Sequence, residues 1–146
     1  MKHFTLIELV AVMAITALLA SVVLSIGNIN NKVTVSQIEI GTMIEKAKLA
    51  NDLTGEDSIV SYDGKELIVQ YYESNASDAV PVIEKFHVED VTLQIFTDGS
   101  AITEFRFSEL QVFPQGPEIR LEISTPKDKG VIIRVNTFTG KVSYYE

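Results

Sequence analysis

Residues 4–26, FTLIELVAVMAITALLASVVLSI, decide how this chain is organised. The stretch carries one charge, Glu8, and the 18 residues from Leu9 to Ile26 are all uncharged. A helix of that length is sufficient to cross the hydrocarbon core of a bilayer. An ionised carboxylate in lipid costs about 2.5 kcal/mol or more, so an intramembrane glutamate normally has a partner and a function.

The residues before this stretch suggest what the partner is. Met1-Lys2-His3 is a short, polar and partly basic head. A cut between His3 and Phe4 would create a free α-amine on Phe4, four residues before Glu8. The amine and the carboxylate can neutralise each other, within one chain or between neighbouring helices of a bundle. Such a pair explains how the apolar segment tolerates Glu8.

The hexapeptide FTLIEL and the apolar run after it resemble the class III N-terminal signal of type IV pilins and type II secretion pseudopilins. In that family a prepilin peptidase cuts before the Phe and methylates the new amine, and Glu is the fifth residue of the mature chain. The resemblance therefore implies cleavage between His3 and Phe4, N-methylation of Phe4, and a role for Glu8 in assembly or processing. His3 departs from the family pattern, which has Gly before the cut, and its bulk can slow or block cleavage.

Three other interpretations of the apolar segment fit less well. A secretory signal peptide has an apolar stretch of about 7–15 residues, which is shorter than this one, and no Glu at its start. A plain single-pass anchor would carry the hexapeptide by accident. A buried core helix is disfavoured because 18 uncharged residues exceed what a small domain usually buries.

Composition and charge limit the functions that the rest of the chain can have. The 146 residues suit one domain plus a helical stalk, and the absence of Cys excludes disulfides and thiolate metal sites. The formal net charge is −8, and residues 1–53 contain four basic and four acidic side chains. Residues 54–146 therefore carry the whole excess of acidic groups. An acidic head repels phosphate backbones, so we expect no nucleic-acid partner.

Residues 28–53 are predicted to form the amphipathic second half of a long helix. Residues 33–36 are locally strand-like, but MIEKAKLANDL is rich in strong helix formers. The apolar residues that recur at helical spacing are Val33, Ile40, Ile44 and Ala47, with Leu49 as a further member. The family resemblance implies that the first half of this helix, residues 4–27, lies in the membrane or filament core and that the second half packs on a sheet.

Residues 54–146 are predicted to form a β-rich head, so the expected fold class is α+β and pilin-like. Alternating apolar and polar residues predict strands at 58–62, 66–72, 80–88, 91–97, 101–107, 118–124, 131–136 and 141–145. Asp63-Gly64 and Asp98-Gly99 are strong hairpin signals. Strands of this length and spacing favour one curved antiparallel sheet or two small ones.

The C-terminal third carries a second resemblance. FPQG at 113–116, followed by EIRLEIS and by GVIIRVNTFTGKVS, is similar to the end of the H-type minor pseudopilins. In that family a Gly-containing turn leads into a hairpin, and the last strand follows a Thr-Gly-Lys/Arg-Val element, here Thr139 to Val142. This similarity favours a minor subunit over a major one.

Nothing in the sequence indicates catalysis or a cofactor. His87 is the only histidine outside the leader and falls in a predicted strand, where we interpret it as a surface or partly covered residue. The sequence contains no GxSxG, HExxH or phosphate-binding glycine loop. A calcium site built from Glu89, Asp90 and Asp98 can be imagined, but their spacing matches no known loop, so no metal is expected.

These observations predict a minor structural subunit of a type IV pilus-like filament or type II secretion pseudopilus. Residues 1–3 would be the leader, and the chain would sit in the cytoplasmic (inner) membrane with its head outside the cytoplasm before entering a periplasmic or extracellular filament. The expected partners are the prepilin peptidase, other subunits and the inner-membrane assembly platform. The alternatives are a major pilin and an unprocessed single-pass protein whose head binds a ligand.

Overall fold

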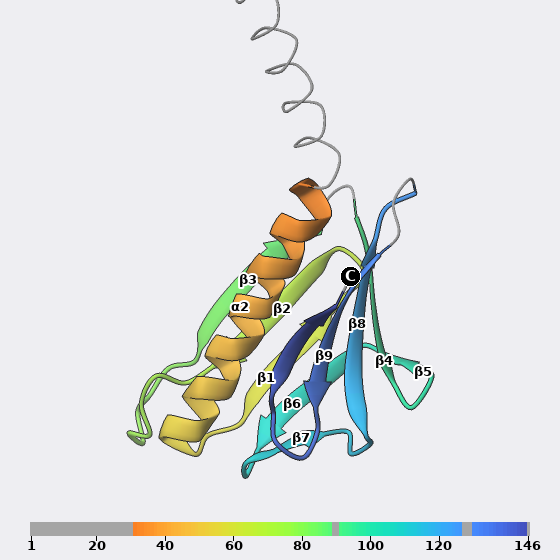
Figure 1. Ribbon diagram of the computed structural model, residues 1–146. Helices are drawn as coiled ribbons and strands as arrows, with labels where there is room; N and C mark the ends of the chain where they lie inside the picture. The colour runs from red at the N-terminus through yellow and green to blue at the C-terminus, as the bar shows by residue number, and fades with distance from the viewer. Residues whose placement is uncertain (1–30, 89–90, 127–129, 146) are drawn as a thin grey trace, which may run out of the picture. The chain divides into compact units, whose positions relative to one another are not determined.

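The computed structural model describes residues 31–88, 91–126 and 130–145 (Figure 1). The expected leader and apolar segment, residues 1–3 and 4–27, lie outside these ranges. None of the helices within the described ranges has the length and apolar character needed to cross a membrane. The described residues form one α-helix and ten β-strands, and those from Val33 onward belong to one compact unit.

The helix, α2, spans Asn31–Thr54. It includes residues 33–36, whose strand-like preference is overridden because Val33 and Ser36 lie on the same buried side as Ile40. The helix ends where Gly55 takes φ +75° and donates its N–H to the carbonyl of Asn51 at 2.8 Å. This left-handed cap is one that glycine adopts without steric strain.

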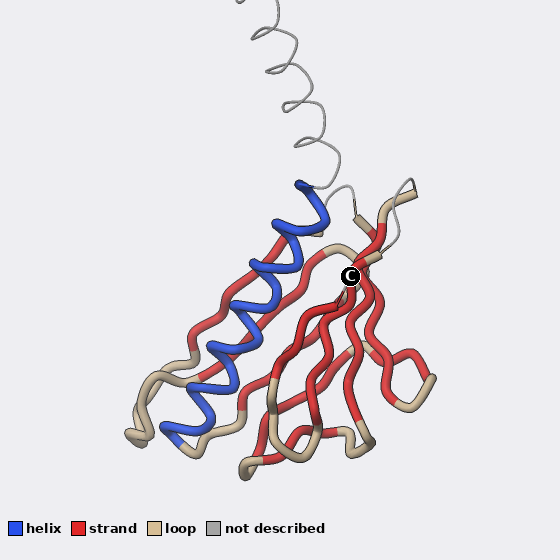
Figure 2. Tube along the Cα trace, in the orientation of Figure 1, coloured by secondary structure: helices blue, strands red, loops and turns tan. Residues whose placement is uncertain are grey.

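The ten strands form two five-stranded antiparallel sheets, which is one of the two arrangements that the strand pattern left open (Figures 1 and 2). The first sheet has the order β3-β2-β1-β6-β7. Its strands are β1 Ser58–Tyr62, β2 Glu66–Tyr71, β3 Val82–His87, β6 Glu104–Ser108 and β7 Gln111–Phe113. The second sheet has the order β10-β9-β8-β4-β5. Its strands are β4 Thr92–Thr97, β5 Ser100–Ile102, β8 Glu118–Ser124, β9 Val131–Asn136 and β10 Val142–Tyr145.

The prediction of a single strand over 101–107 was wrong. The chain bends at Thr103, so β5 pairs with β4 in the second sheet and β6 pairs with β1 in the first. The pattern of buried residues shifts by one position at this bend. Before it the partly buried residue is the even-numbered Ile102, and after it the buried residues are the odd-numbered Phe105 and Phe107. The three-residue strand β7 was also missed, since it is too short to show an alternation.

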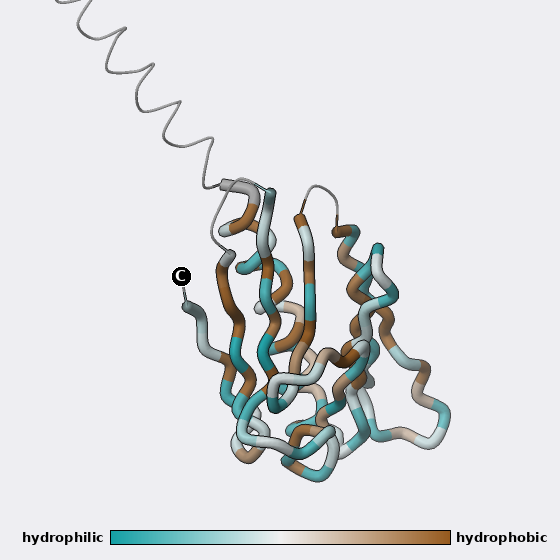
Figure 3. The backbone as a smooth tube through the Cα atoms, turned by 90° about the vertical axis from the view of Figure 1, so that its right-hand side faces the viewer, coloured by the Kyte–Doolittle hydropathy of each residue, from teal (hydrophilic) through white to brown (hydrophobic). Residues whose placement is uncertain are grey.

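The core lies between the two sheets and under α2. Apolar and polar residues alternate along the strands (Figure 3), and in β8 the buried positions are the apolar ones. The fully buried residues with the largest side chains are Phe105, Phe107, Ile40, Ile44, Leu67, Ile95, Ile119, Leu121, Ile123, Ile133, Val60 and Val69. Phe105 and Phe107 meet edge to face with ring centroids 5.9 Å apart. The helix, both sheets and this aromatic pair therefore share one core.

The helix also covers the open side of β10. Gln37 is buried, and its Nε2 donates to the backbone carbonyls of Ile132 and Tyr145, each at 3.3 Å. The Tyr144 hydroxyl donates to Glu45 Oε1 at 2.8 Å, and a Cβ at Gly41 would clash with the Tyr144 ring. A helix-weakening glycine is therefore tolerated at position 41 because it admits the C-terminal strand.

The β6–β7 hairpin has an unusual turn. Ser108 pairs with Gln111, and the two residues between them, Glu109 and Leu110, have φ values of 48° and 66°. A two-residue turn of this hand favours Asn-Gly or Asp-Gly, and the β4–β5 hairpin indeed uses Asp98-Gly99. Holding a residue with a side chain in the left-handed region costs about 1–2 kcal/mol.

We expect Leu110→Gly to stabilise the folded state by about 1 kcal/mol, because it relieves this cost. Little packing is lost, since Leu110 is 71% exposed. Urea unfolding of the full chain in detergent would measure the change. The reciprocal substitution Gly99→Ala should destabilise by a similar amount. Equal stability of both variants and the parent chain would contradict the interpretation.

Candidate functional site

The sequence-predicted site residues do not fall in the described part of the chain. His3, Phe4 and Glu8 all precede residue 31. Of the three residues considered for calcium, Glu89 and Asp90 also lie outside the described ranges, and Asp98 occupies the β4–β5 turn. Within residues 31–88, 91–126 and 130–145, no three His, Asp or Glu side chains gather in a way that could hold a metal ion.

His87 lies on the outer face of β3, as expected for a surface strand residue. Its Nδ1 is 3.0 Å from Glu66 Oε1, and the Lys85 ammonium is 3.2 Å from Glu66 Oε2. Hydrogen bonds from Lys85 and then His87 lower the pKa of Glu66. These side chains are substantially exposed, so the cluster is a solvated charge group of small energetic weight.

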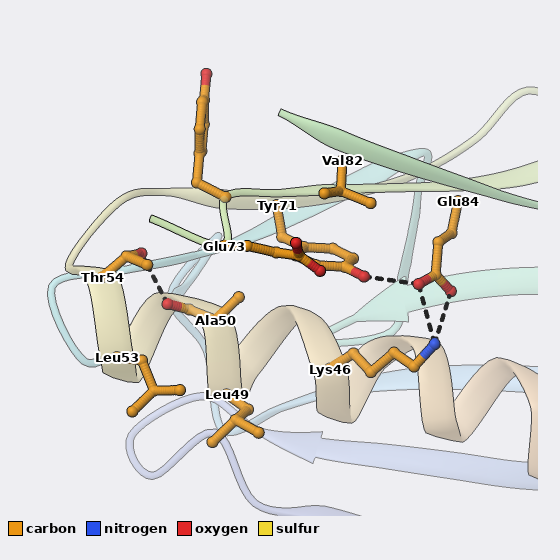
Figure 4. A pocket seen from close by; sticks show the side chains of 10 residues that line it. Lys46, Leu49, Ala50, Leu53, Thr54, Tyr71, Glu73, Val82 and Glu84 are labelled. Carbon is orange, nitrogen blue, oxygen red and sulfur yellow. Dashed lines mark hydrogen bonds and ion pairs between the residues drawn. The ribbon is translucent and has the colours of Figure 1, made fainter. Parts of the chain in front are cut away.

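A groove lies between α2 and the β2–β3 hairpin (Figure 4). Its volume is about 550 Å³. The helix contributes Lys46, Leu49 and Leu53 to its lining, and the strands contribute Tyr71, Val82 and Glu84, among others. Leu49 and Leu53 are 57% and 75% exposed, so the groove has an apolar wall open to solvent.

Three polar side chains cross one end of the groove. Lys46 Nζ donates to both carboxylate oxygens of Glu84, at 3.0 and 3.3 Å, and the Tyr71 hydroxyl donates to Glu84 Oε1 at 2.6 Å (Figure 4). The hydrogen bond to Glu84 and then burial raise the pKa of Tyr71 to about 12. The hydrogen bonds from Tyr71 and then Lys46 lower the pKa of Glu84. Near neutral pH the tyrosine therefore stays protonated and the glutamate ionised, so the cluster braces helix against strand and is not poised for proton transfer.

The raised pKa of Tyr71 predicts a loss of stability at alkaline pH. An unfolded tyrosine ionises near pH 10, whereas folded Tyr71 holds its proton to about pH 12. The contribution is therefore complete below pH 10 and is lost as the pH rises from about 10 to 12. Tyr71→Phe should make the free energy of unfolding fall less steeply over this range.

Denaturant titrations at pH values from 8 to 12 would measure that slope. Tyr144→Phe gives an independent second test, because burial and then the hydrogen bond to Glu45 also raise the pKa of Tyr144, on β10, to about 12. Each substitution should remove part of the slope, and the double variant should remove more than either. A slope that is unchanged in Tyr71→Phe would refute the assignment of the Tyr71–Glu84 bond.

A second hollow continues along the same side of the helix. Its volume is about 290 Å³, and Ile38, Thr42, Met43 and Phe86 line it. Lys46 lines both hollows, so the Lys46–Glu84 ion pair stands between them. Ile38 is 59% exposed.

A solved protein structure has a fold similar to that of this chain. The type IV minor pilin FimU of Pseudomonas aeruginosa, known from a crystal structure, is similar over 80% of this chain and 90% of that one, with a TM-score of 0.59. The fold is pilin-like. The identity between the two chains is 18%, so the similarity concerns the fold and not individual side chains. Neither the protein-family models nor the curated proteins gave a match to this sequence.

The sequence does not mark the three polar residues of the groove, Lys46, Tyr71 and Glu84, as members of one site. Tyr71 falls within an ordinary alternating strand pattern, and Lys46 falls among the strong helix formers of MIEKAKLANDL, so neither position signals a site by itself. One signal was present in the strand: Glu84 falls between Val82 and Phe86 on the inner-facing phase of β3. A lone carboxylate on that phase needs a cation or a donor, but only the folded chain shows that these are Lys46 and Tyr71.

Proposed function

We propose that this chain is a structural subunit of a type IV pilus-like filament. The observation that carries the proposal is the pilin-like fold of residues that directly follow a FTLIEL segment and a long apolar run. Neither feature depends on the other, because the hexapeptide lies in the first ten residues and the fold similarity rests mainly on the head. Within this role the chain is a structural component and not an enzyme.

The proposed route to the filament uses the N-terminal residues. The peptidase removes residues 1–3 and methylates Phe4, and residues 4–27 hold the subunit in the cytoplasmic membrane. Lys2 on the cytoplasmic side would favour an orientation with the head outside. The assembly platform then transfers the subunit into a helical bundle, where helix packing replaces lipid contact. Glu8 pairs with the Phe4 amine of a neighbour and sets the axial register.

Two features favour a minor subunit over a major pilin. The C-terminal FPQG and Thr-Gly-Lys-Val elements are similar to those of H-type minor pseudopilins, and the solved protein with a similar fold is itself a minor pilin. We therefore propose a low-copy position in a pilus or in a type II secretion pseudopilus. The competing proposal is a single-pass membrane protein that keeps its leader and never polymerises.

Mass spectrometry of the protein from native membranes and from sheared filaments would test this function. We expect the loss of residues 1–3 and the gain of one methyl group on Phe4, and we expect the same species in the filament fraction. His3→Gly should speed the cleavage, because the smaller residue restores the family pattern. Intact Met1 in the membrane pool, together with absence from filaments, would support the single-pass protein instead.

A further inference from the structure

The strand β3 forms an open edge of the first sheet. It lies at the end of the order β3-β2-β1-β6-β7 and is six residues long. The other sheet edges are less available: β5 and β7 have three residues each, and α2 covers β10 through Gln37. A long uncovered edge offers unpaired backbone donors and acceptors to another strand.

The hydrogen-bonding pattern between β2 and β3 identifies which backbone N–H and C=O groups of β3 point away from the sheet. Val88 donates its N–H to the carbonyl of Lys65 at 2.9 Å, so this pair lies in a hydrogen-bonded position of the β2–β3 ladder. Antiparallel ladders alternate, so Val82, Glu84 and Phe86 bond to β2. The N–H and C=O groups of Ile83 and Lys85 therefore point away from β2, and no other described backbone segment pairs with β3.

The helix carries an apolar stripe beside this edge. Ile38, Leu49 and Leu53 are all more than half exposed, and each lines one of the two hollows already described. On β3, Val82 faces the first hollow and Phe86 the second. Four residues of strand span about 13 Å, and the eleven residues from Ile38 to Leu49 span about 16 Å of helix. The two hollows thus have a spacing that one extended segment can match.

We propose that β3 accepts an extended segment of another polypeptide as a sixth strand, which packs its inner side chains against α2. Main-chain bonds to Ile83 and Lys85 would hold the segment, and alternate side chains would enter the hollows. A segment that fits this edge has two apolar residues four positions apart, one for each hollow. A small polar residue midway between them lies above the Lys46–Glu84 pair. On its outer face an acidic residue would lie opposite Lys85, whose side chain is more than half exposed.

A second copy of β3 does not fit this edge. Antiparallel self-pairing that uses the outward-facing groups sets Lys85 opposite Lys85 or Glu84 opposite Glu84, and like charges directly opposite destabilise a strand pair. A shift toward the start of the strand brings Pro81 into the ladder, where it lacks a donor, and a shift toward its end pairs only residues 85–87. The occupant is therefore a different segment. The inference does not depend on the filament role, since it concerns only the described head.

A labelled synthetic peptide tests the site directly. The peptide carries two leucines four positions apart, a threonine midway between them and glutamates on the opposite face. Titration with the full chain in detergent, followed by fluorescence anisotropy, should show saturable binding. A peptide of the same composition with the leucines on opposite faces should bind at least about tenfold more weakly. Equal binding of the two peptides, or no saturable binding, would overturn the proposal.

Two variants and a control assign the binding to this edge. Ile83→Pro removes an outward N–H while leaving the bonds to β2, and Leu49→Ser removes an exposed wall of the first hollow. Each should weaken peptide binding at least about tenfold. Leu110→Ser, at an even more exposed leucine on the β6–β7 turn, should have no effect. Binding that survives both edge variants would refute the assignment to this edge. Concentration-dependent dimerisation that Ile83→Pro abolishes would refute the assignment to a different polypeptide.

Discussion

Ile44→Ala is expected to lower the free energy of unfolding by about 2–4 kcal/mol relative to the parent chain. Ile44 is fully buried at the centre of the helix face that packs on the core. Removing three carbon atoms there forfeits their burial and leaves a cavity that the neighbouring strands fill only in part. Because most small domains are stable by about 5–15 kcal/mol, this change should lower the midpoint of urea unfolding markedly.

Leu49→Ala is the matched control for that prediction. It lies on the same helix and removes the same number of atoms, but Leu49 is 57% exposed in the groove. We expect a loss below about 1 kcal/mol, since the leucine is only partly buried and leaves no enclosed cavity. Circular dichroism during urea unfolding of both variants would give the comparison. Equal losses at the two positions would mean that the helix is rotated from the orientation described.

The largest effect on assembly is expected from Glu8→Gln. The amide keeps the shape and hydrogen-bonding capacity of the side chain but removes its charge, so in the proposed filament the neighbour's Phe4 amine would be left without compensation. Removing one partner of a buried ion pair costs about 3–5 kcal/mol. That loss is enough to prevent recruitment of the subunit, whereas membrane insertion and cleavage of the leader should continue.

Crosslinking in assembled filaments, with parallel measurement of leader cleavage, would distinguish these steps. Glu39→Gln is the control, because it makes the same chemical change at an exposed position of α2. Wild-type incorporation of the Glu39 variant and absence of the Glu8 variant would support the pairing. Equal incorporation of both would exclude a charge-dependent role for Glu8.

Local sequence patterns predicted most of the strands because each pattern reports burial on one face. β1, β8 and β9 have the predicted bounds, and β2, β3, β4 and β10 differ from prediction by only one or two residues at an end. Alternation of apolar and polar residues is a property of neighbouring positions and needs no tertiary information. The same holds for the hairpin at Asp98-Gly99, where glycine accepts the left-handed conformation that the turn requires.

The helix shows where local sequence patterns stop being sufficient and the tertiary structure is needed. Val33, Ile40, Ile44 and Ala47 are buried as predicted, but Leu49 is exposed. The helical spacing of apolar residues identified a stripe along the helix, but it did not reveal how much of that stripe the sheets cover. The buried side continues through Ala50 and Asn51, so Leu49 falls beyond the edge at β3. Only the packed structure shows which apolar residues the sheets reach.

The sequence by itself determined that the chain has an apolar N-terminal segment with a lone carboxylate, a following helix and an antiparallel β-rich head. The tertiary structure decided how the strands of that head divide between two sheets, with one of the crossings at Thr103, and which helix side remains open beside β3. It also brought Lys46 and Tyr71 to Glu84 from separate parts of the chain. Local patterns arise from neighbouring residues, whereas sheet order and side-chain pairing depend on contacts between residues far apart in sequence, which no local pattern records.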